Sequence, residues 1–306
     1  MGNQLKYPNV LKNNINNTQI FDCIFAMSTM QGWSTSLNVK HIFINNEKYC
    51  IFGIFDGHTS DICSNFCVQI FSNIFSRNTE DSTSLFFDNI KQTFINIFKE
   101  LDDEFKEFIK EKSIDSEEYK SGTTVMLIYV TQTNFVIINA GDSRCIIIDK
   151  LSKSITMTSI LHDSQNESEN KLISKTSMEF SRGIGFFKYK SGPIENHGII
   201  NIPDVTIIEK TKNTIIMIAT NNIYKKISDR KLLWYIFRKK KYNFINPITF
   251  ENNFTYPIDK YYEHIEENTT ASEIDDSSLL KICENIIDIA FDLGSKNNFM
   301  VGMFSL

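Results

Sequence analysis

Residues 53–58 read GIFDGH, and they follow the apolar run Cys50-Ile51-Phe52 without a break. A strand that ends in this way delivers a carboxylate and an imidazole to one point at the edge of a sheet. Asp56 is therefore a candidate metal ligand and His58 a candidate for proton transfer. The simpler alternatives are a tight turn at Asp56-Gly57 and a packed, hydrogen-bonded His58.

The composition favours a globular protein. The chain has 306 residues, 42% of them hydrophobic, which is enough apolar material for a single large domain over 1–306. The formal net charge of −5 gives no general nucleic-acid-binding footprint. Six scattered cysteines lack the spacing of a zinc site, so we expect buried free thiols in a reducing cytosol and a cytoplasmic protein.

The N-terminal sequence predicts neither export nor a membrane span. It has no signal-like apolar run, and no stretch of about 18 apolar residues occurs in the chain. Gly2 in MGNQLK stands at the acceptor position for N-myristoylation, but Lys6 replaces the favoured Ser or Thr. One acyl chain would anchor the protein only weakly, which leaves membrane association as an alternative.

Hydrophobic periodicity predicts antiparallel strands and separate helices. Apolar residues have helical spacing over 61–75, 86–110 and 279–293, and strand-like runs cover 41–44, 49–55, 123–130, 135–140, 144–149 and 299–306. TQTN (131–134) predicts a hairpin, and EKTKN (209–213) is expected to join a further strand pair, 205–208 with 214–219. Residues 1–20 are expected to be a short N-terminal extension, partly strand and partly loop. Together these elements are typical of an α+β layered domain.

Residues 243–278 break the pattern because they are polar, acid-rich and interrupted by Pro247 and Pro257. We expect a surface insertion there. The basic run RKKK (238–241) just before it is expected to be a solvated helix end, with contact to an anion or an acidic lipid as the alternative.

Further motifs accompany GIFDGH along the chain. They are STMQGW (28–33), SGTT (121–124), NAGDSR (139–144), FSRGIGFFKYK (180–190) and DLGSKNNFMVGMF (292–304). In this order and at these distances they resemble the metal-dependent, type 2C Ser/Thr protein phosphatases, from about residue 24 to the C-terminus. The resemblance implies a four-layer α+β sandwich, in which two antiparallel β-sheets are flanked by helices on both sides. It also implies two Mg²⁺ or Mn²⁺ ions that activate a bridging water for attack on phosphorus.

Several positions depart from the pattern of the family, and each of the changes replaces a charged residue by a neutral one. They are Ser34 for an Arg that grips phosphate, Asn38 and Val39 for a Glu-Asp pair, Asn221 for an Asp at a strand end, Asn297 for an Asp near the C-terminus, and Phe186 for the Asp of a Gly-Asp. Without the arginine, the bidentate grip on a phosphate is lost.

The resemblance leaves Asp56, the carbonyl of Gly57 and Asp142 as metal ligands, and His58 with a vestigial catalytic role. Two dications about 4 Å apart repel each other by about 16 kcal/mol at an effective dielectric constant of about 20. One or two carboxylates do not balance this repulsion, so we expect either no metal or one weakly bound Mg²⁺ or Mn²⁺. Asp142 has a structural alternative, which is an ion pair with Arg144 or a place in a turn.

The sequence therefore predicts a phosphatase 2C-like pseudophosphatase that acts as a binding or regulatory module for a protein partner or phosphoprotein. One alternative is a weakly active Ser/Thr phosphatase with a single-metal site, in which Asn221 and Asn297 supply neutral ligands. Another is a membrane-tethered adaptor that uses Gly2 and the basic run.

Overall fold

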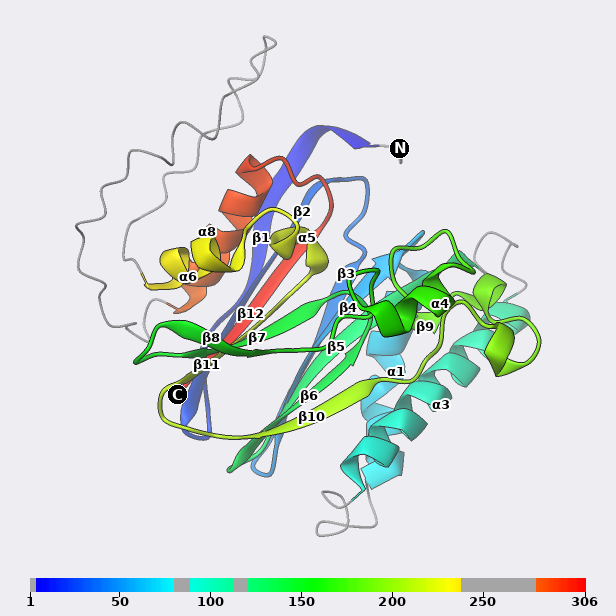
Figure 1. Cartoon of the computed structure of the whole chain (residues 1–306), viewed down its shortest axis with the longest axis horizontal. Coiled ribbons are helices and arrows are strands. Elements are labelled where there is room, and N and C mark those ends of the chain that lie inside the picture. The colour runs from blue at the N-terminus through cyan, green and yellow to red at the C-terminus, as the bar shows by residue number, and fades with distance from the viewer. Residues whose placement is uncertain (1–3, 80–88, 113–119, 238–278) are drawn as a thin grey trace.

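The computed structural model describes residues 4–79, 89–112, 120–237 and 279–306, and in these ranges the chain forms two packed antiparallel sheets (Figure 1). The first sheet has the order β1-β2-β12-β11-β7-β8, and the second has the order β10-β6-β5-β4-β3, with β9 beside β5. The strands are β1 Gln4–Ile20, β2 Cys23–Ser34, β3 Val39–Asn45, β4 Cys50–His58, β5 Gly122–Val130, β6 Asn134–Ala140, β7 Arg144–Asp149, β8 Ser154–Thr158, β9 Ile184–Gly185, β10 Asp204–Glu209, β11 Thr214–Ala219 and β12 Phe299–Ser305.

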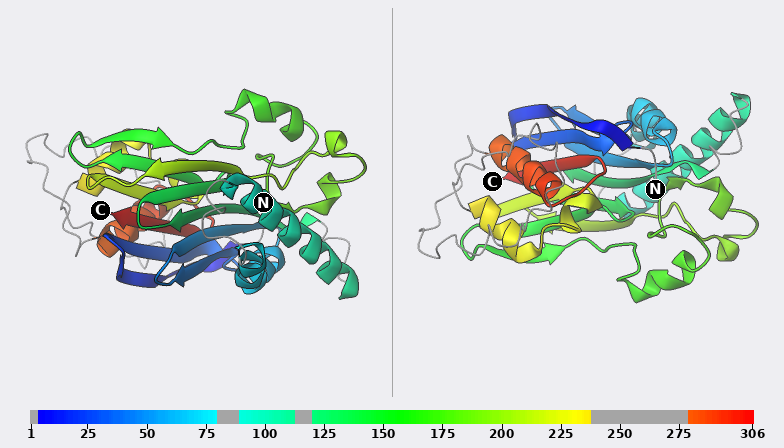
Figure 2. Two further views of the ribbon diagram at one scale, coloured as in Figure 1. Left: turned by 90° about the horizontal axis from the view of Figure 1, so that it is seen from below. Right: turned by 90° about the horizontal axis from the view of Figure 1, so that it is seen from above.

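Helices cover the outer face of each sheet (Figure 2). The helices of the described ranges are α1 Ile62–Thr79, α3 Ile90–Glu111, α4 Asn170–Ile173, α5 Asn221–Tyr224, α6 Asp229–Phe237 and α8 Leu279–Asp292, and the short α4 lies in the connection between β8 and β9. The predicted stripe on α3 packs with α1 against the second sheet, whereas α6 and α8 pack against the first. The predicted α+β fold class, a four-layer sandwich of two antiparallel sheets flanked by helices, is confirmed.

The alternation of side chains along β4 shows how the layers form. Phe52 and Ile54 belong to the core between the sheets, while Ile51 and Phe55 face the helices α1 and α3. The ring of Phe25 on β2 lies 4.7 Å from that of Phe52 and joins the two sheets. Because both faces of β4 are buried, the strand is apolar throughout until it reaches Asp56.

Two expectations from the sequence were wrong. Residues 4–20, expected to be partly loop, form the continuous strand β1, which pairs with β2 along the edge of the first sheet. Residues 205–208 and 214–219 are strands but do not pair with each other. Strand β10 pairs with β6 in the second sheet and β11 with β7 and β12 in the first, so EKTKN crosses between sheets. By contrast, the TQTN hairpin between β5 and β6 is confirmed.

The six cysteines are all buried and free, as expected from the sequence. Burial raises the pKa of the Cys23 thiol to about 11 and that of Cys50 to about 12. The thiolate is the reactive form, so we expect all six thiols to resist a water-soluble disulfide reagent in the native protein. All six should react after unfolding in guanidinium chloride. A thiol that reacts within seconds in the native state would contradict this burial.

In the described ranges, no helix has both the length and the apolar character needed to cross a lipid bilayer. Gly2, the basic run 238–241 and the insertion 243–278 lie outside the described residues. The expectations for these three segments therefore stay predictions.

Candidate functional site

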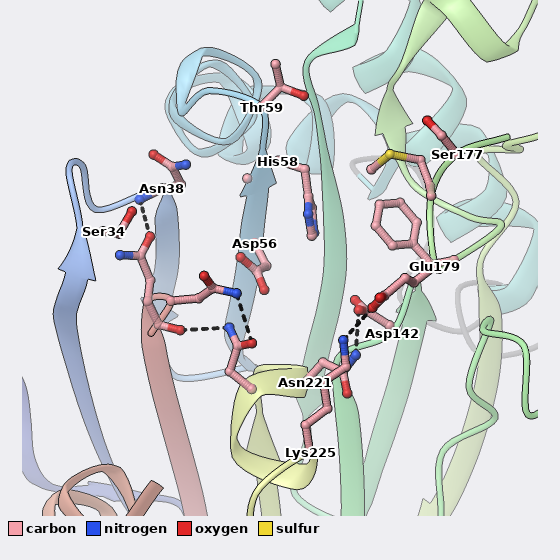
Figure 3. Close-up of a pocket in the computed structure, with 16 residues that line it drawn as sticks. Ser34, Asn38, Asp56, His58, Thr59, Asp142, Ser177, Glu179, Asn221 and Lys225 are labelled. Atoms are coloured by element: carbon pink, nitrogen blue, oxygen red, sulfur yellow. Dashed lines mark hydrogen bonds and ion pairs between the residues drawn. The ribbon is translucent and has the colours of Figure 1, made fainter. Parts of the chain in front are cut away.

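A pocket of about 350 Å³ opens where β4 ends, beside α5 and the turn that follows β6 (Figure 3). The structure brings nearly all the residues predicted from the sequence to its wall. They are Ser34, Asn38, Asp56, Gly57, His58, Asp142, Asn221 and Asn297. These residues come from six separate stretches of chain, so only the fold assembles them.

Two of the positions that depart from the family pattern, Val39 and Phe186, do not line the pocket. Val39 is registered opposite Asp56 in the β3–β4 pair, which places the two Cβ atoms about 4.5–5.5 Å apart. The Val39 side chain is only 1% exposed and belongs to the core between the sheets. An alkyl group thus lies beside the Asp56 carboxylate at this point.

Asp56 is a buried carboxyl group at the floor of the pocket, with 8% of its surface exposed. Burial raises its pKa to about 6, to which the negative charge of Asp142 contributes, while His58 and Lys225 lower it. The next residue, Gly57, donates its N–H to the carbonyl oxygen of Asn38 at 3.2 Å. A Cβ at Gly57 would lie 2.8 Å from that oxygen, so the close approach of the two chains requires glycine.

Asp142 occupies the turn between β6 and β7. Its Oδ2 accepts a hydrogen bond of 2.7 Å from the Nδ2 of Asn221. Its Oδ1 is buried and has no hydrogen-bond partner in the part of the chain that the structure describes. The ion pair with Arg144 is not formed, because Arg144 makes a bidentate pair with Asp229 at 2.7 and 2.8 Å. Of the two structural alternatives, the turn is therefore the one observed.

A buried histidine that the sequence analysis missed holds this turn in place. Gly141 donates its N–H to Nδ1 of His162 at 3.0 Å, so Nδ1 carries no proton. The proton is on Nε2, which donates to Asp204 at 2.9 Å. Gly141 also has φ +140° and packs so closely on Thr124 that a Cβ would lie 2.3 Å from the threonine side chain.

Asn298, next to the predicted Asn297, organises the opposite wall. Its Oδ1 accepts the backbone N–H of Asn38 at 2.6 Å, and its Nδ2 donates to the carbonyl oxygens of Gln31 and Ser36. Asn222 donates to the carbonyl oxygen of Asn298 at 3.1 Å. The side chains of Asn297 and Asn298 thus form hydrogen bonds mainly with other residues of the pocket wall and its supporting backbone.

Lys225 and Glu179 face each other across the mouth of the pocket, and the sequence analysis missed both. Their ion pair measures 2.5 Å and joins the end of α5 to the segment before Phe180. The signal for Lys225 lay in the stretch TIIMIATNNIYKK (214–226), because a residue four positions after Asn221 lies on the same side of a helix.

The ring of His58 packs against that of Phe180 at 4.7 Å. Its Nε2 is buried, and none of the described residues hydrogen-bonds it. The structural alternative of a packed histidine is correct for the ring, whereas the hydrogen bond expected with it is not found at Nε2.

The donor set for a divalent metal is sparse in the described ranges. There, no cluster of three or more His, Cys, Asp or Glu side chains could hold a metal ion. Asn221 directs its amide N–H at Asp142, and Asn297 directs its own at Asn222 at 3.3 Å. Glu179, the third carboxylate of the pocket, is engaged by Lys225.

Several known proteins of similar sequence carry the name protein phosphatase 2C. The probable protein phosphatase 2C 3 of Paramecium tetraurelia is 27% identical over 233 residues, which cover 70% of this chain and 77% of that protein. The protein phosphatase 2C homolog 3 of Schizosaccharomyces pombe is 24% identical, over 78% of this chain and 60% of that protein.

Solved structures show the same fold. The serine-threonine phosphatase 2C from Toxoplasma gondii superimposes with a TM-score of 0.67 at 11% identity, over 96% of this chain and 99% of that one. A sex determining protein from C. elegans gives 0.64 at 13% identity, over 98% of this chain and 65% of that one. The model of the family described as Protein phosphatase 2C matches residues 24–241. The chain therefore belongs to the protein phosphatase 2C family.

Proposed function

We propose that this protein is a pseudophosphatase, in which the phosphatase 2C domain serves as a binding or regulatory module for another protein. The observation that carries the proposal is the lining of the pocket. Where the chemistry of the family needs converging carboxylates, the chain has the amides of Asn38, Asn221 and Asn297 and the ammonium group of Lys225.

The residues present do not fit the two Mg²⁺ or Mn²⁺ ions that the family typically uses. Asp56 and Asp142 are the carboxylates left at the floor, and one oxygen of Asp142 already accepts from Asn221. A pair of dications needs several carboxylates to offset their mutual repulsion. Lys225 engages Glu179, the third carboxylate of the pocket, which leaves that group less able to offset the charge of a metal ion.

The group that would hold a phosphoryl substrate is missing as well. Ser34 lines the pocket where the family has an arginine, and a hydroxyl provides neither the charge nor the paired donors of a guanidinium. Phosphoryl transfer depends mainly on positioning and on stabilising negative charge. Loss of both the metal ligands and the arginine removes both contributions.

We expect no metal-dependent hydrolysis of a generic aryl phosphate or a phosphopeptide in excess Mn²⁺. The measurement compares the wild-type rate with that of the Asp56→Ala variant, because a contaminating phosphatase would contribute equally to both. A clear Mn²⁺-dependent rate that Asp56→Ala abolishes would rule out the pseudophosphatase.

The alternative is weak phosphatase activity with a single metal ion, and one observation favours it. Asp56 and Asp142 are both retained, and the Oδ1 of Asp142 has no partner among the described residues. Titration calorimetry with Mg²⁺ and Mn²⁺ distinguishes the two proposals. Saturable binding of one ion at millimolar concentration, lost in Asp56→Ala, would favour the single-metal phosphatase, and no heat of binding would exclude it.

A further inference from the structure

The pocket carries a net negative charge. Three carboxylates line it, from Asp56, Asp142 and Glu179, against the single ammonium group of Lys225. A phosphatase site with two bound dications attracts a phosphate, but the same cavity without them attracts a cation. The loss of metal ligands therefore changes the sign of the charge that the pocket prefers.

A buried acceptor without a partner strengthens this argument. Asp142 lines the pocket and is 6% exposed, and its buried Oδ1 has no hydrogen-bond partner in the described ranges. A buried charged oxygen without a donor costs free energy unless a ligand supplies one. Asp56, 8% exposed, lines the same pocket, so its carboxylate adds a second negative charge beside that of Asp142.

Several of the amide donors around the pocket are engaged by the protein itself. The NH₂ groups of Asn221 and Asn297 donate to Asp142 and Asn222, while Asn298 donates to two backbone carbonyl oxygens. The ammonium group of Lys225 is paired with Glu179. Both N–H groups of Asn298, at least one each of Asn221 and Asn297, and the ammonium group of Lys225 are thus already engaged within the wall.

Among cations, a guanidinium suits this cavity best. It has five planar donors, is more weakly hydrated than an ammonium group, and stacks on aromatic rings. The rings of His58 and Phe180 form one side of the pocket. The volume of about 350 Å³ lies at the lower end of the range for ligand pockets, roughly 300–1,000 Å³.

We propose that the pocket binds an arginine side chain of a partner protein, whose guanidinium donates to the carboxylates of Asp142 and Asp56. This inference rests on the proposed role as a binding module and names the chemistry of its partner. Lys225 is an internal competitor, because its ammonium group neutralises part of the same negative charge. Its ion pair with Glu179 is half exposed, with 49% and 76% of the two side chains accessible, so it can open to admit a ligand.

The test titrates the full-length, ¹⁵N-labelled protein with the tripeptide Ac-Gly-Arg-Gly-NH₂ and follows amide chemical shifts. The neutral isostere with citrulline in place of arginine and the peptide with phosphoserine are titrated in parallel. We expect the arginine peptide to bind most tightly and its affinity to fall as salt is added. A phosphoserine peptide that binds more tightly than the arginine peptide would overturn the proposal.

Two variants, each with a matched control, are expected to change the affinity for the arginine peptide in opposite directions. Asp142→Asn should weaken binding of the arginine peptide by about tenfold or more, because a charged acceptor is lost. Lys225→Met should strengthen it severalfold. The controls Asp103→Asn on α3 and Lys226→Met, both at exposed residues, should change little. If Asp142→Asn does not fold, Lys225→Met alone tests the proposal. Removal of the ammonium group should strengthen binding at a cation site and weaken binding at an anion site.

Failure of this inference is distinguishable from failure of the proposed function. If the arginine peptide does not bind, or if neither Asp142→Asn nor Lys225→Met changes its affinity, the proposal of a cation site is wrong. The proposal of a pseudophosphatase would not be affected by that result. Metal-dependent turnover would instead remove the binding module on which the inference rests.

Discussion

Replacing Arg182 by alanine is expected to lower the free energy of unfolding by about 3–5 kcal/mol. The guanidinium donates to Glu169 through Nη2 at 2.6 Å and through Nε at 3.2 Å. It also donates to the carbonyl oxygen of Ile202 at 3.0 Å. Glu169 is only 3% exposed, so the alanine variant would leave a carboxylate buried with much of its charge compensation gone.

The pH dependence of this effect follows from the same contacts. Burial opposes ionisation of Glu169, but the hydrogen bonds from Arg182 and Ser181 lower its pKa below the ordinary value. The hydrogen bond from His162 and the charge of Arg182 lower the pKa of Asp204, against the effect of burial. A carboxyl group whose pKa is lower in the folded than in the unfolded protein stabilises the fold at pH values above the unfolded-state pKa. This stabilisation is lost as the pH falls through the folded-state pKa. The difference in the free energy of unfolding between wild type and Arg182→Ala should therefore become smaller below about pH 4.

Urea denaturation at neutral pH measures the loss, with Arg230→Ala, an exposed arginine on α6, as the control. Adding Glu169→Gln to Arg182→Ala should recover part of the loss, because the double variant no longer buries an uncompensated charge. A loss below about 1 kcal/mol in the single variant would show that the network contributes no more than a surface ion pair.

Restoring carboxylates to the pocket is expected to create a metal site. The combined substitutions Asn38→Glu, Asn221→Asp and Asn297→Asp add three negative charges at positions that line the cavity. A carboxylate about 4 Å from a dication contributes roughly 8 kcal/mol of attraction at an effective dielectric constant of about 20, before the cost of desolvation. We expect the affinity for Mn²⁺ to rise by about a hundredfold or more over wild type.

Electron paramagnetic resonance of free Mn²⁺ measures this binding directly, without reference to activity. The matched control is Asn13→Asp, Asn16→Asp and Asn196→Asp, which changes the net charge equally at exposed positions. If the control gains as much affinity as the restored variant, net charge rather than the pocket governs binding. A restored variant that folds and still binds no Mn²⁺ would show that lost carboxylates are not what limits the site.

The local pattern of apolar residues was enough to predict most of the helices and strands, because a buried helix and a buried strand each repeat their apolar side chains with a characteristic period. The apolar run 49–55 predicted a strand, which the structure confirms as β4. The pattern could not assign β10 and β11 to different sheets, because strand pairing depends on contacts distant in the sequence. The sequence likewise could not show that Arg144 prefers Asp229 to its near neighbour Asp142.

The sequence by itself predicted the family and the layered fold, which are confirmed, and it indicated the positions that we propose have lost charge, because all of these depend on residue identity and order. Only the tertiary structure decided what fills the pocket instead. It turned the amide of Asn221 toward Asp142, buried Val39 opposite Asp56 on the neighbouring strand, and brought Lys225 to Glu179 from segments 46 residues apart. The physical reason is that electrostatic effects depend on distance and burial, and in a folded chain neither follows from separation along the sequence.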